Sequence, residues 1–378
     1  MKLAIFQPRI SYFTGGSEKA ALRHIEYLNR NYGLHIDVYT IRPPHESFHP
    51  EYLACKSRIG QQVRFYEIEI PAAYRYFYDE SPSSDHLRWD SESLLFSALV
   101  SPLLQGKKYD CLLSYYIVDA LYKPVGIPNA VYLGGYPRDE VPIYRSFVRQ
   151  CHAVLANSND VLTNWEPVLA HNKNLKKFVL KKGVDAPNAK EKESPFVPGG
   201  FHIVYVGRLI ERKGVRVLIE AFERFVQEVG DVHLWIIGDG PERTHLESIV
   251  TSSNVHFLGT RMDAYDFYEN ADICVFPSIM GEGMLTTACE AMMCGACVVA
   301  TTGNGNESFI HSGENGMLVP PGDANALLSA LKYLYKDGVV RSKFGREARR
   351  YAQEHFSWEH ATKDLYQKLL EIAAIRKS

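Results

Sequence analysis

Strand-like apolar runs alternate with amphipathic helical patterns along the chain, and this alternation constrains the fold more than any other feature. Strands separated by helical crossovers form parallel sheets with helices on both faces. In the first half the expected strands are residues 3–6, 36–41, 63–70, 111–115, 130–133 and 153–156. In the second half they are residues 202–206, 232–237, 255–257, 273–276, 297–300 and 317–319. Helices are expected over residues 17–29, 215–229, 324–335 and 341–355, so the fold class is α/β.

A polar segment separates the two series of strands. Residues 187–200 contain three prolines, two glycines and a cluster of charges, which is typical of a linker. We therefore expect two doubly wound, Rossmann-like domains, residues 1–186 and 201–357, that face each other across a cleft. Ligand is expected at the carboxyl ends of the strands. The amphipathic segment that begins at residue 358 fits either domain.

Charge and composition exclude several classes of protein. Lys and Arg number 42 and Asp and Glu number 44, so the net charge of −2 provides no general basic field for nucleic acid. No apolar run approaches the roughly 18 residues of a membrane span, and the run before Gln7 is too short for a secretion signal. We expect a cytoplasmic protein with reduced cysteines. The CxxC pair Cys294 and Cys297 is interpreted as small buried residues rather than as a redox or zinc motif, and no metal site is expected.

The segment Ser278–Gly295, SIMGEGMLTTACEAMMCG, carries the clearest chemical signal. It follows the apolar run 273–276 and combines a glycine-containing loop with a helix that is expected to begin at Thr286 or Thr287. Free backbone N–H groups at a helix N-terminus are suited to phosphate. Glu282 and Glu290, separated by seven residues, add acceptors for sugar hydroxyls. The segment outlines a nucleotide-sugar site.

Other glycine loops follow the expected strands. After the strand 202–206, Gly207 permits a tight turn, and Arg208 and Lys213 suit a diphosphate or form a solvated charged loop. The run 238–242 begins a dinucleotide fingerprint that Arg243 leaves incomplete, so it is interpreted as a tight turn before a helix.

Two further loops carry candidate ligand contacts. Gly15 and Gly16 precede a helix for which Ser17 is a plausible N-cap, so this loop either approaches a ligand or simply caps the helix. Residues 304–307, Asn-Gly-Asn-Glu, could hydrogen-bond a sugar or form a polar turn.

In order, these segments resemble the retaining glycosyltransferases of the GT-B fold, family 4 (glycosyl transferases group 1). The resembling pieces are GGSEKA (15–20), NSNDV (157–161), KGVD (182–185), GRLIERKG (207–214), IIGDGPE (236–242), FLGT (257–260), ADICVFPS (271–278), EAMMCG (290–295) and ENGMLVPPGDANAL (314–327), together with the E-x7-E pair. The match is dense from residue 203 to residue 330 and thin before residue 150.

The resemblance implies a C-terminal domain that holds the nucleotide sugar and an N-terminal acceptor domain on which the final helix, 358–378, packs back. Arg208 and Lys213 would hold the diphosphate, and Glu282 would face the hydroxyls of the donor sugar. Glu290 would accept hydrogen bonds from the ribose. The remaining contacts to the donor would come from glycines and backbone N–H groups, at Gly15, Gly16, Gly207, Gly259, Gly283, Met284, Leu285 and Thr286.

The resemblance further implies a reaction without metal or cofactor, in which cations and a helix N-terminus carry the charge of the leaving diphosphate. The chain has no Asp-x-Asp motif, consistent with this reaction. The family retains the anomeric configuration. A nucleotide-diphosphate sugar, most simply a UDP-sugar, would be the co-substrate.

The chain departs from the family pattern in two places. Where the family has E-G-F-G-L, residues 282–285 are Glu-Gly-Met-Leu, and the side chain of Leu285 is expected to narrow the space beside the donor sugar. The segment 131–138 lacks the histidine that many members place there. Its residues Gly134, Gly135, Tyr136 and Arg138 are therefore candidates for a different acceptor subsite.

The acceptor itself stays open. Aromatic residues between Tyr74 and Trp89 favour a glycan, whereas the basic, amphipathic segment 143–149 favours a lipid-linked acceptor and a peripheral contact with the inner face of the membrane. Ordinary packing explains both equally well. Two alternative functions are a UDP-sugar epimerase of GT-B type and a non-catalytic protein that binds nucleotide sugars. The sequence does not choose the donor sugar, the base or the oligomeric state.

Overall fold

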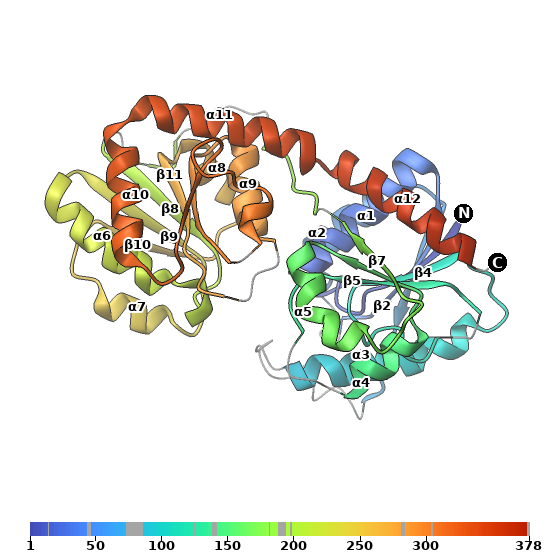
Figure 1. Ribbon diagram of the computed structural model, residues 1–378. Coiled ribbons are helices and arrows are strands. Elements are labelled where there is room, and N and C mark those ends of the chain that lie inside the picture. The colour runs from blue at the N-terminus through green and yellow to red at the C-terminus, as the bar shows by residue number, and fades with distance from the viewer. Residues whose placement is uncertain are drawn as a thin grey trace. The chain divides into compact units, whose positions relative to one another are not determined.

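Figure 1 shows the computed structural model of the chain. Contacts divide the chain into two compact units: unit 1 is Met1–Gly183 with Trp358–Ser378, and unit 2 is Val184–Ser357. The structure describes residues 1–13, 15–43, 47–72, 86–123, 126–137, 142–180, 182–187, 194–196, 199–280, 284–303 and 305–375. For residues 86–88 this description covers the backbone alone.

Unit 1 is built on a seven-stranded parallel sheet in the order β3-β2-β1-β4-β5-β6-β7, which is a doubly wound arrangement. Its strands are β1 (Lys2–Phe6), β2 (His35–Ile41), β3 (Val63–Ile68), β4 (Cys111–Ser114), β5 (Asn129–Leu133), β6 (Ala153–Ala156) and β7 (Lys176–Val179). The sequence pattern predicts the first six. It misses the edge strand β7, because Lys176 and Lys177 are exposed and interrupt the apolar run.

Helices cover both faces of this sheet (Figure 1). Successive residues of a strand point to opposite faces, so Leu3 and Ile5 pack on one side and Ala4 and Phe6 on the other. The first face is covered by α1 (Gly16–Tyr32), α2 (Pro50–Arg58) and α12 (Trp358–Ala374). The second face is covered by α3 (His86–Val100), the short 3-10 helix η2 (Ser101–Leu104), α4 (Pro142–Gln150) and α5 (Asn159–Leu169).

The helix α12 packs against α1 within unit 1. The ring of Trp358 lies 5.6 Å from the ring of His24, and Tyr366 stacks on Tyr32 with 4.1 Å between centroids. A Cβ atom at Gly183 would approach the Trp358 ring to 2.3 Å, so only glycine fits beside this indole. The C-terminal helix is therefore part of the unit formed by the first 183 residues.

Unit 2 is built on a six-stranded parallel sheet in the order β10-β9-β8-β11-β12-β13. The six strands lie where the sequence predicts them: β8 (Phe201–Val206), β9 (Val232–Ile237), β10 (Val255–Gly259), β11 (Ile273–Phe276), β12 (Val298–Thr301) and β13 (Met317–Val319). Its helices are η3 (Glu211–Lys213), α6 (Val215–Val229), α7 (Arg243–Ile249), α8 (Ala264–Asn270), α9 (Thr286–Cys294), η4 (Asn306–Ser308), α10 (Ala324–Lys336) and α11 (Gly338–His355). The prediction of two parallel-sheet, Rossmann-like domains is confirmed.

Part of the expected linker is packed on unit 2 rather than extended in solvent. Phe196 is buried, and its ring stacks on His202 at 4.2 Å and lies 5.3 Å from Trp235. The composition of 187–200 indicates a linker because proline, glycine and charge dominate it. A single aromatic side chain is nevertheless enough to fix residues 194–196 to the domain that follows.

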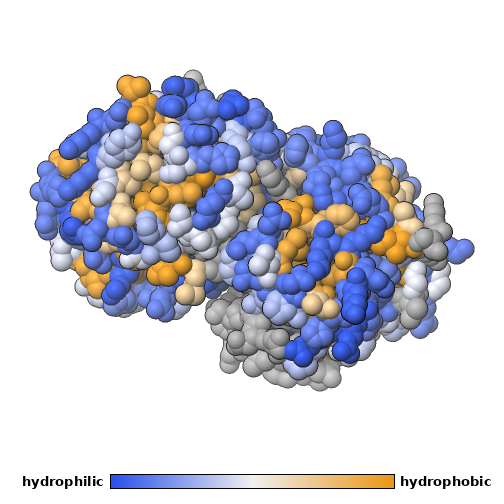
Figure 2. Space-filling view, viewed as in Figure 1, coloured by the Kyte–Doolittle hydropathy of each residue, from blue (hydrophilic) through white to orange (hydrophobic). Residues whose placement is uncertain are grey.

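A mostly polar surface and buried cysteines are the features expected of a protein with well-filled cores. The face of the molecule in Figure 2 is largely hydrophilic, with its apolar side chains in separate groups. All seven cysteines are free and buried. Burial raises the pKa of the Cys297 thiol to about 12, as expected for a packing residue rather than a reactive thiol. Within the described ranges, no helix combines the length and apolar character that crossing a membrane requires.

Candidate functional site

The candidate donor site of unit 2 lies at the carboxyl ends of β8 and β11. These strands are neighbours in the sheet although two strands, β9 and β10, lie between them along the chain, so the sheet changes winding direction between them. In open parallel sheets, ligands bind at this position. The backbone N–H of Ile279, after β11, donates to the carbonyl oxygen of Arg212, after β8, at 2.8 Å.

Two glycines make this approach of the loops possible. Gly214 has φ of +67°, and a Cβ atom there would lie 2.0 Å from the carbonyl oxygen of Pro277. A Cβ atom at Gly207 would lie 2.6 Å from the Tyr205 hydroxyl oxygen, which itself donates to the carbonyl of Arg208 at 3.0 Å. The glycines therefore hold the loop of Arg208 against the segment after β11.

Arg208 and Lys213 occupy this loop as the sequence predicts. The side chain of Arg208 is exposed and forms no ion pair or hydrogen bond with any described residue. Lys213 ends η3, is partly buried and has interactions of its own. Arg208 is thus a cation without a protein counter-ion among the described residues, at the edge of the sheet where a ligand is expected.

The helix α9 begins at Thr286, as predicted, with Leu285 as its N-cap. The side chain of Leu285 cannot accept a hydrogen bond, so the first N–H groups of α9 receive no side-chain cap from it. Leu285 and Met284 are buried in the core of unit 2. The expectation that the Leu285 side chain narrows the space beside the sugar is therefore wrong, because this side chain points into the domain core rather than into solvent.

Glu290 lies in the second turn of α9 on the side that faces α8. Burial raises the pKa of Tyr268 in α8, and the negative charge of Glu290 raises it further. The Glu290 carboxylate is therefore near that helix. The helix α8 follows β10, which ends at Gly259 with φ of +67°. Glu290 therefore lies near the helix that follows the Gly259 turn.

Two other loops of unit 2 contain residues with structural contacts. A Cβ atom at Gly238 would lie 1.9 Å from the carbonyl oxygen of Gly207, so the Gly238–Gly240 run is a close backbone crossing, and α7 begins at Arg243. Asn306 is fully buried and donates to the carbonyl of Thr301 at 2.8 Å. Asn306 is therefore unavailable to a sugar and fixes the turn after β12.

In unit 1, Gly15 and Gly16 follow β1. Gly15, not Ser17, is the N-cap of α1, because the carboxylate of Glu18 accepts from the Gly15 N–H at 3.1 Å. Gly16 is exposed. The tight loop is thus anchored by Glu18, while its backbone stays open to solvent at Gly16.

The candidate acceptor loop after β5 is held by hydrogen bonds from the α5 region. The Asn157 amide donates to the carbonyl of Gly134 at 3.0 Å, and the Trp165 indole donates to the carbonyl of Gly135 at 2.8 Å. The Tyr136 hydroxyl donates to Asp160. Tyr136 is therefore already engaged, whereas Gly134 is exposed and can approach a ligand.

A buried charge cluster at the β1 and β4 ends of unit 1 has no counterpart in the sequence prediction. Arg9 is 3% exposed, pairs with Glu92 at 2.7 Å, and donates to Ser93 at 2.9 Å. Asp119 after β4 is fully buried, and burial raises its pKa to about 7 against the opposing charge of Arg9. Ionisable groups in such surroundings are enriched at functional sites.

This cluster reaches the Gly15 loop through side chains. The Gln7 amide donates to Glu18 at 3.0 Å, and its carbonyl oxygen accepts from the Arg9 N–H at 3.1 Å. Glu18 in turn holds the Gly15 N–H. The charged residues of the cluster lie in separate segments of the chain, within α1 and α3 and after β1 and β4, so no local sequence pattern indicates the cluster.

Three predicted site residues, Glu282, Gly283 and Arg138, lie outside the described residues, as do residues 74–78 with their aromatic side chains. The helix α4 forms within the segment proposed for membrane contact, but Tyr144, Phe147 and Val148 are buried in unit 1. Its apolar side is therefore used in folding. Among the described residues, no three His, Cys, Asp or Glu side chains are grouped as a metal ion would need.

The fold and the loops of unit 2 define a Rossmann-like domain with an exposed cation at the carboxyl edge of its sheet, and comparison with known proteins agrees with this fold class. Residues 200–337 match the family model for glycosyl transferases group 1. The lipopolysaccharide core biosynthesis glycosyltransferase LpsE of Rhizobium meliloti is 33% identical over 172 residues, which are 44% of this chain and 49% of LpsE. The chain spans about half the length of the curated relatives that it matches.

Solved glycosyltransferase structures share the whole fold. A sucrose-phosphate synthase from Thermosynechococcus elongatus aligns over 99% of this chain and all of its own, with a TM-score of 0.81 and 19% identity. HepE of Anabaena, crystallised with UDP, aligns over 98% of this chain and 100% of its own, with a TM-score of 0.75 and 18% identity. At these identities the likeness shows the fold.

Proposed function

We propose that this chain is a retaining, metal-independent glycosyltransferase of family 4 that moves a sugar from a nucleotide-diphosphate sugar, UDP-linked, to a glycan or lipid-linked acceptor. One observation carries the proposal. Arg208 is exposed and has no counter-ion among the described residues, on a loop that the Ile279–Arg212 hydrogen bond joins to the segment before α9. The match of 200–337 to glycosyl transferases group 1 supports it.

The chemistry follows from these groups. Breaking the bond between sugar and diphosphate leaves negative charge on the phosphate oxygens, which Arg208, Lys213 and the N-terminus of α9 stabilise. This stabilisation needs no metal ion and no cofactor. The family resemblance assigns Glu282 to the donor sugar and Glu290 to the ribose hydroxyls. The acceptor oxygen bonds to the anomeric carbon as the bond to the diphosphate breaks, and the leaving phosphate takes the acceptor proton on the same face.

The names of similar proteins support the choice of substrates. HepE was crystallised with UDP and with UDP-glucose, and LpsE takes part in lipopolysaccharide core biosynthesis. A UDP-sugar donor and a polysaccharide or lipid-linked acceptor are accordingly proposed for this chain. With the apolar side of α4 buried, a peripheral contact with the membrane would require another surface.

UDP binding to Arg208→Ala tests the proposal. A charge-assisted hydrogen bond contributes about 1.5–3 kcal/mol, so calorimetry should show a loss of affinity of roughly 10- to 150-fold. Arg216→Ala is the matched control, because Arg216 is also an exposed arginine of unit 2 but lies in α6. Equal binding by Arg208→Ala and the parent would refute the diphosphate assignment.

Product analysis separates the alternatives. Incubation with UDP-sugars and glycan or lipid extracts should yield a glycoside with the donor's anomeric configuration, in the presence of EDTA. Interconversion of UDP-sugars without an acceptor would indicate an epimerase. The lack of a histidine in residues 131–138 favours a non-catalytic nucleotide-sugar-binding protein as the second candidate, for which UDP binds but no sugar is released or transferred.

A further inference from the structure

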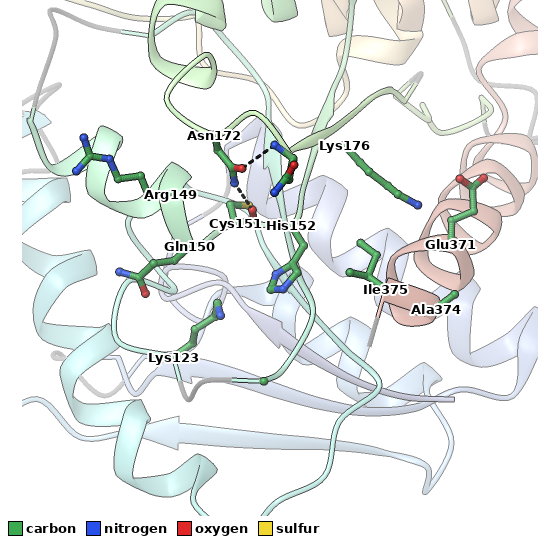
Figure 3. A pocket seen from close by; sticks show the side chains of 12 residues that line it. Lys123, Arg149, Gln150, Cys151, His152, Asn172, Lys176, Glu371, Ala374 and Ile375 are labelled. Carbon is green, nitrogen blue, oxygen red and sulfur yellow. Dashed lines mark hydrogen bonds between the residues drawn. The ribbon is translucent and has the colours of Figure 1, made fainter. Parts of the chain in front are cut away.

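A cavity of about 850 Å³ lies in unit 1 at the amino ends of β5, β6 and β7 (Figure 3). Its walls come from the turns before these strands and from the last turn of α12. Pockets for small organic ligands span roughly 300–1,000 Å³, so the cavity has room for one. The candidate residues Gly15 and Gly134 follow strand carboxyl ends, so the cavity is at the opposite edge of the sheet.

The lining of this cavity is strongly cationic. Lys123, Arg149, His152 and Lys176 contribute basic groups, and Glu371 is the one acid among the lining residues. Within the described part of the chain, no ion pair neutralises Lys123, Arg149 or Lys176, and Glu371 pairs with none of them. The cavity therefore carries an uncompensated positive charge.

Two of these groups are partly withdrawn from water. Burial lowers the pKa of Lys123, and burial together with the charge of Lys123 lowers the pKa of His152. The His152 ring stands between Lys123 and the end of α12 in Figure 3, with Nδ1 held 2.7 Å from Asn129 Oδ1. A partly buried cation without a counter-ion costs free energy, and a bound anion would offset this cost.

The walls are fixed by hydrogen bonds, so little ordering is needed on binding. The Asn172 amide donates to the carbonyl of Val148 at 2.9 Å and to the carbonyl of Cys151 at 2.7 Å, which ties the turn before β7 to the turn before β6. Opposite this turn, Ala374 at the end of α12 and the adjacent Ile375 offer an apolar surface. A preorganised site loses less conformational entropy when ligand binds.

We propose that this cavity binds a phosphate-bearing organic anion, with the phosphate beside Lys123 and His152 and the organic part against Ala374 and Ile375. Lysine is a compact point charge suited to phosphate, and the lining offers more than one. A soluble phosphate ester and a lipid headgroup share this chemistry. The site is separate from the donor site and does not depend on the function proposed above.

Calorimetric titration of the full chain with inorganic pyrophosphate tests the site. The Arg208→Ala background removes the proposed diphosphate site of unit 2. In that background, Lys123→Met with Lys176→Met should weaken binding at least about tenfold, the ratio equivalent to about 1.4 kcal/mol. Lys173→Met is the control, since Lys173 lies in the same turn but outside the lining, and it should bind like its background.

No binding by the Arg208→Ala background, or equal binding by the double lysine variant with an unchanged Tm, would overturn the proposal. Two competitors then identify the source of the phosphate. Displacement of pyrophosphate by phosphatidylglycerol vesicles, but not by phosphatidylcholine vesicles, supports a headgroup. Displacement by glucose 1-phosphate alone supports a soluble ester. In either case the pKa of His152, followed by NMR, should rise on binding, because the anion favours its protonated form.

Discussion

The backbone N–H of Ile279 donates to the carbonyl oxygen of Arg212 at 2.8 Å, and this contact connects the two halves of the proposed donor site. On one side is the loop that carries Arg208 and Lys213. On the other is the segment that leads through Met284 and Leu285 into α9. The relative position of the cations and the helix N-terminus therefore depends on a backbone contact, which substitutions of Arg208 leave intact.

Gly214→Ala should break this arrangement. The new Cβ would lie 2.0 Å from the Pro277 carbonyl oxygen at a φ of +67°, so the loops must separate. Strained backbone of this kind costs about 1–3 kcal/mol, and the clash adds to it. We expect a lower Tm and weaker UDP binding. Gly230→Ala is the control: its φ of +88° gives backbone strain, but no atom lies within 4 Å of the Cβ. A normal UDP affinity for Gly214→Ala would contradict the argument.

Glu290→Gln should reduce discrimination between UDP and its 2′-deoxy analogue. A carboxylate that accepts from a ribose hydroxyl makes a charge-assisted hydrogen bond worth about 1.5–3 kcal/mol. We expect the parent to prefer UDP by roughly tenfold or more and the variant to lose most of this preference, as measured by calorimetry. Glu269→Gln, at an exposed acid of α8, should keep it. An unchanged preference in Glu290→Gln would remove Glu290 from the ribose site.

Asp119→Asn should stabilise the protein increasingly as pH rises. Because the folded-state pKa is raised to about 7, folding favours the protonated acid. This contribution is full below the unfolded-state pKa near 4 and is lost as pH rises to about 7. An asparagine at this position does not ionise, so the variant does not lose this contribution to stability as pH rises. We expect the Tm difference between variant and parent to grow from pH 5 to pH 8, by an amount equivalent to about 1 kcal/mol or more. A constant difference would show that Asp119 does not titrate there.

Arg9→Met should destabilise unit 1 strongly, because Glu92 would be left buried without its partner. Removing one member of a buried pair costs about 3–5 kcal/mol, whereas the double variant Arg9→Met/Glu92→Leu should recover a large part of the loss. The exposed pair Arg42–Glu69 is the control, and Arg42→Met should cost less than about 1 kcal/mol. Urea denaturation measures all three. Similar losses for Arg9→Met and Arg42→Met would contradict the buried-pair assignment.

Thiol reagents should not label Cys294 or Cys297 in the folded protein. Both are buried, and burial raises the pKa of each, to about 12 for Cys297, so the reactive thiolate is scarce at neutral pH. Mass spectrometry after brief exposure to iodoacetamide should find both unmodified, and labelling in urea should be complete. Rapid labelling of the folded protein would revive the redox interpretation of the CxxC pair.

The order of strands and the loops of unit 2 follow from local sequence, since each strand is a continuous apolar run and each glycine lies at a turn. Three features of the fold do not follow from local sequence. β7 is held by its pairing with β6 rather than by its own apolar content, and Phe196 acts through rings that are distant in sequence until folding brings them together. The direction of the Leu285 side chain is set by the core of unit 2.

Some parts of the candidate site could likewise be predicted from the sequence, and other parts could not. The positions of Arg208 and of the start of α9 are encoded in short motifs, and the structure places them as predicted. The charge cluster joins Arg9, which follows β1, to residues of α3 and to Asp119, which follows β4, at positions 80 to 110 residues further along the chain. No local pattern shows that such residues will share one buried volume, so only the folded chain reveals it.

Because α12 completes the same hydrophobic face that α1 and α2 cover, the first unit is assembled from two stretches of chain with the whole of the second unit between them. During synthesis, domains generally fold in the order in which they leave the ribosome. Here residues 1–183 emerge first, but their core cannot be completed until Trp358 and Leu365 have been translated. Until then Leu3, Ile25 and neighbouring core residues are incompletely covered. The second unit can close earlier, so of these two units the one that emerges first is completed second.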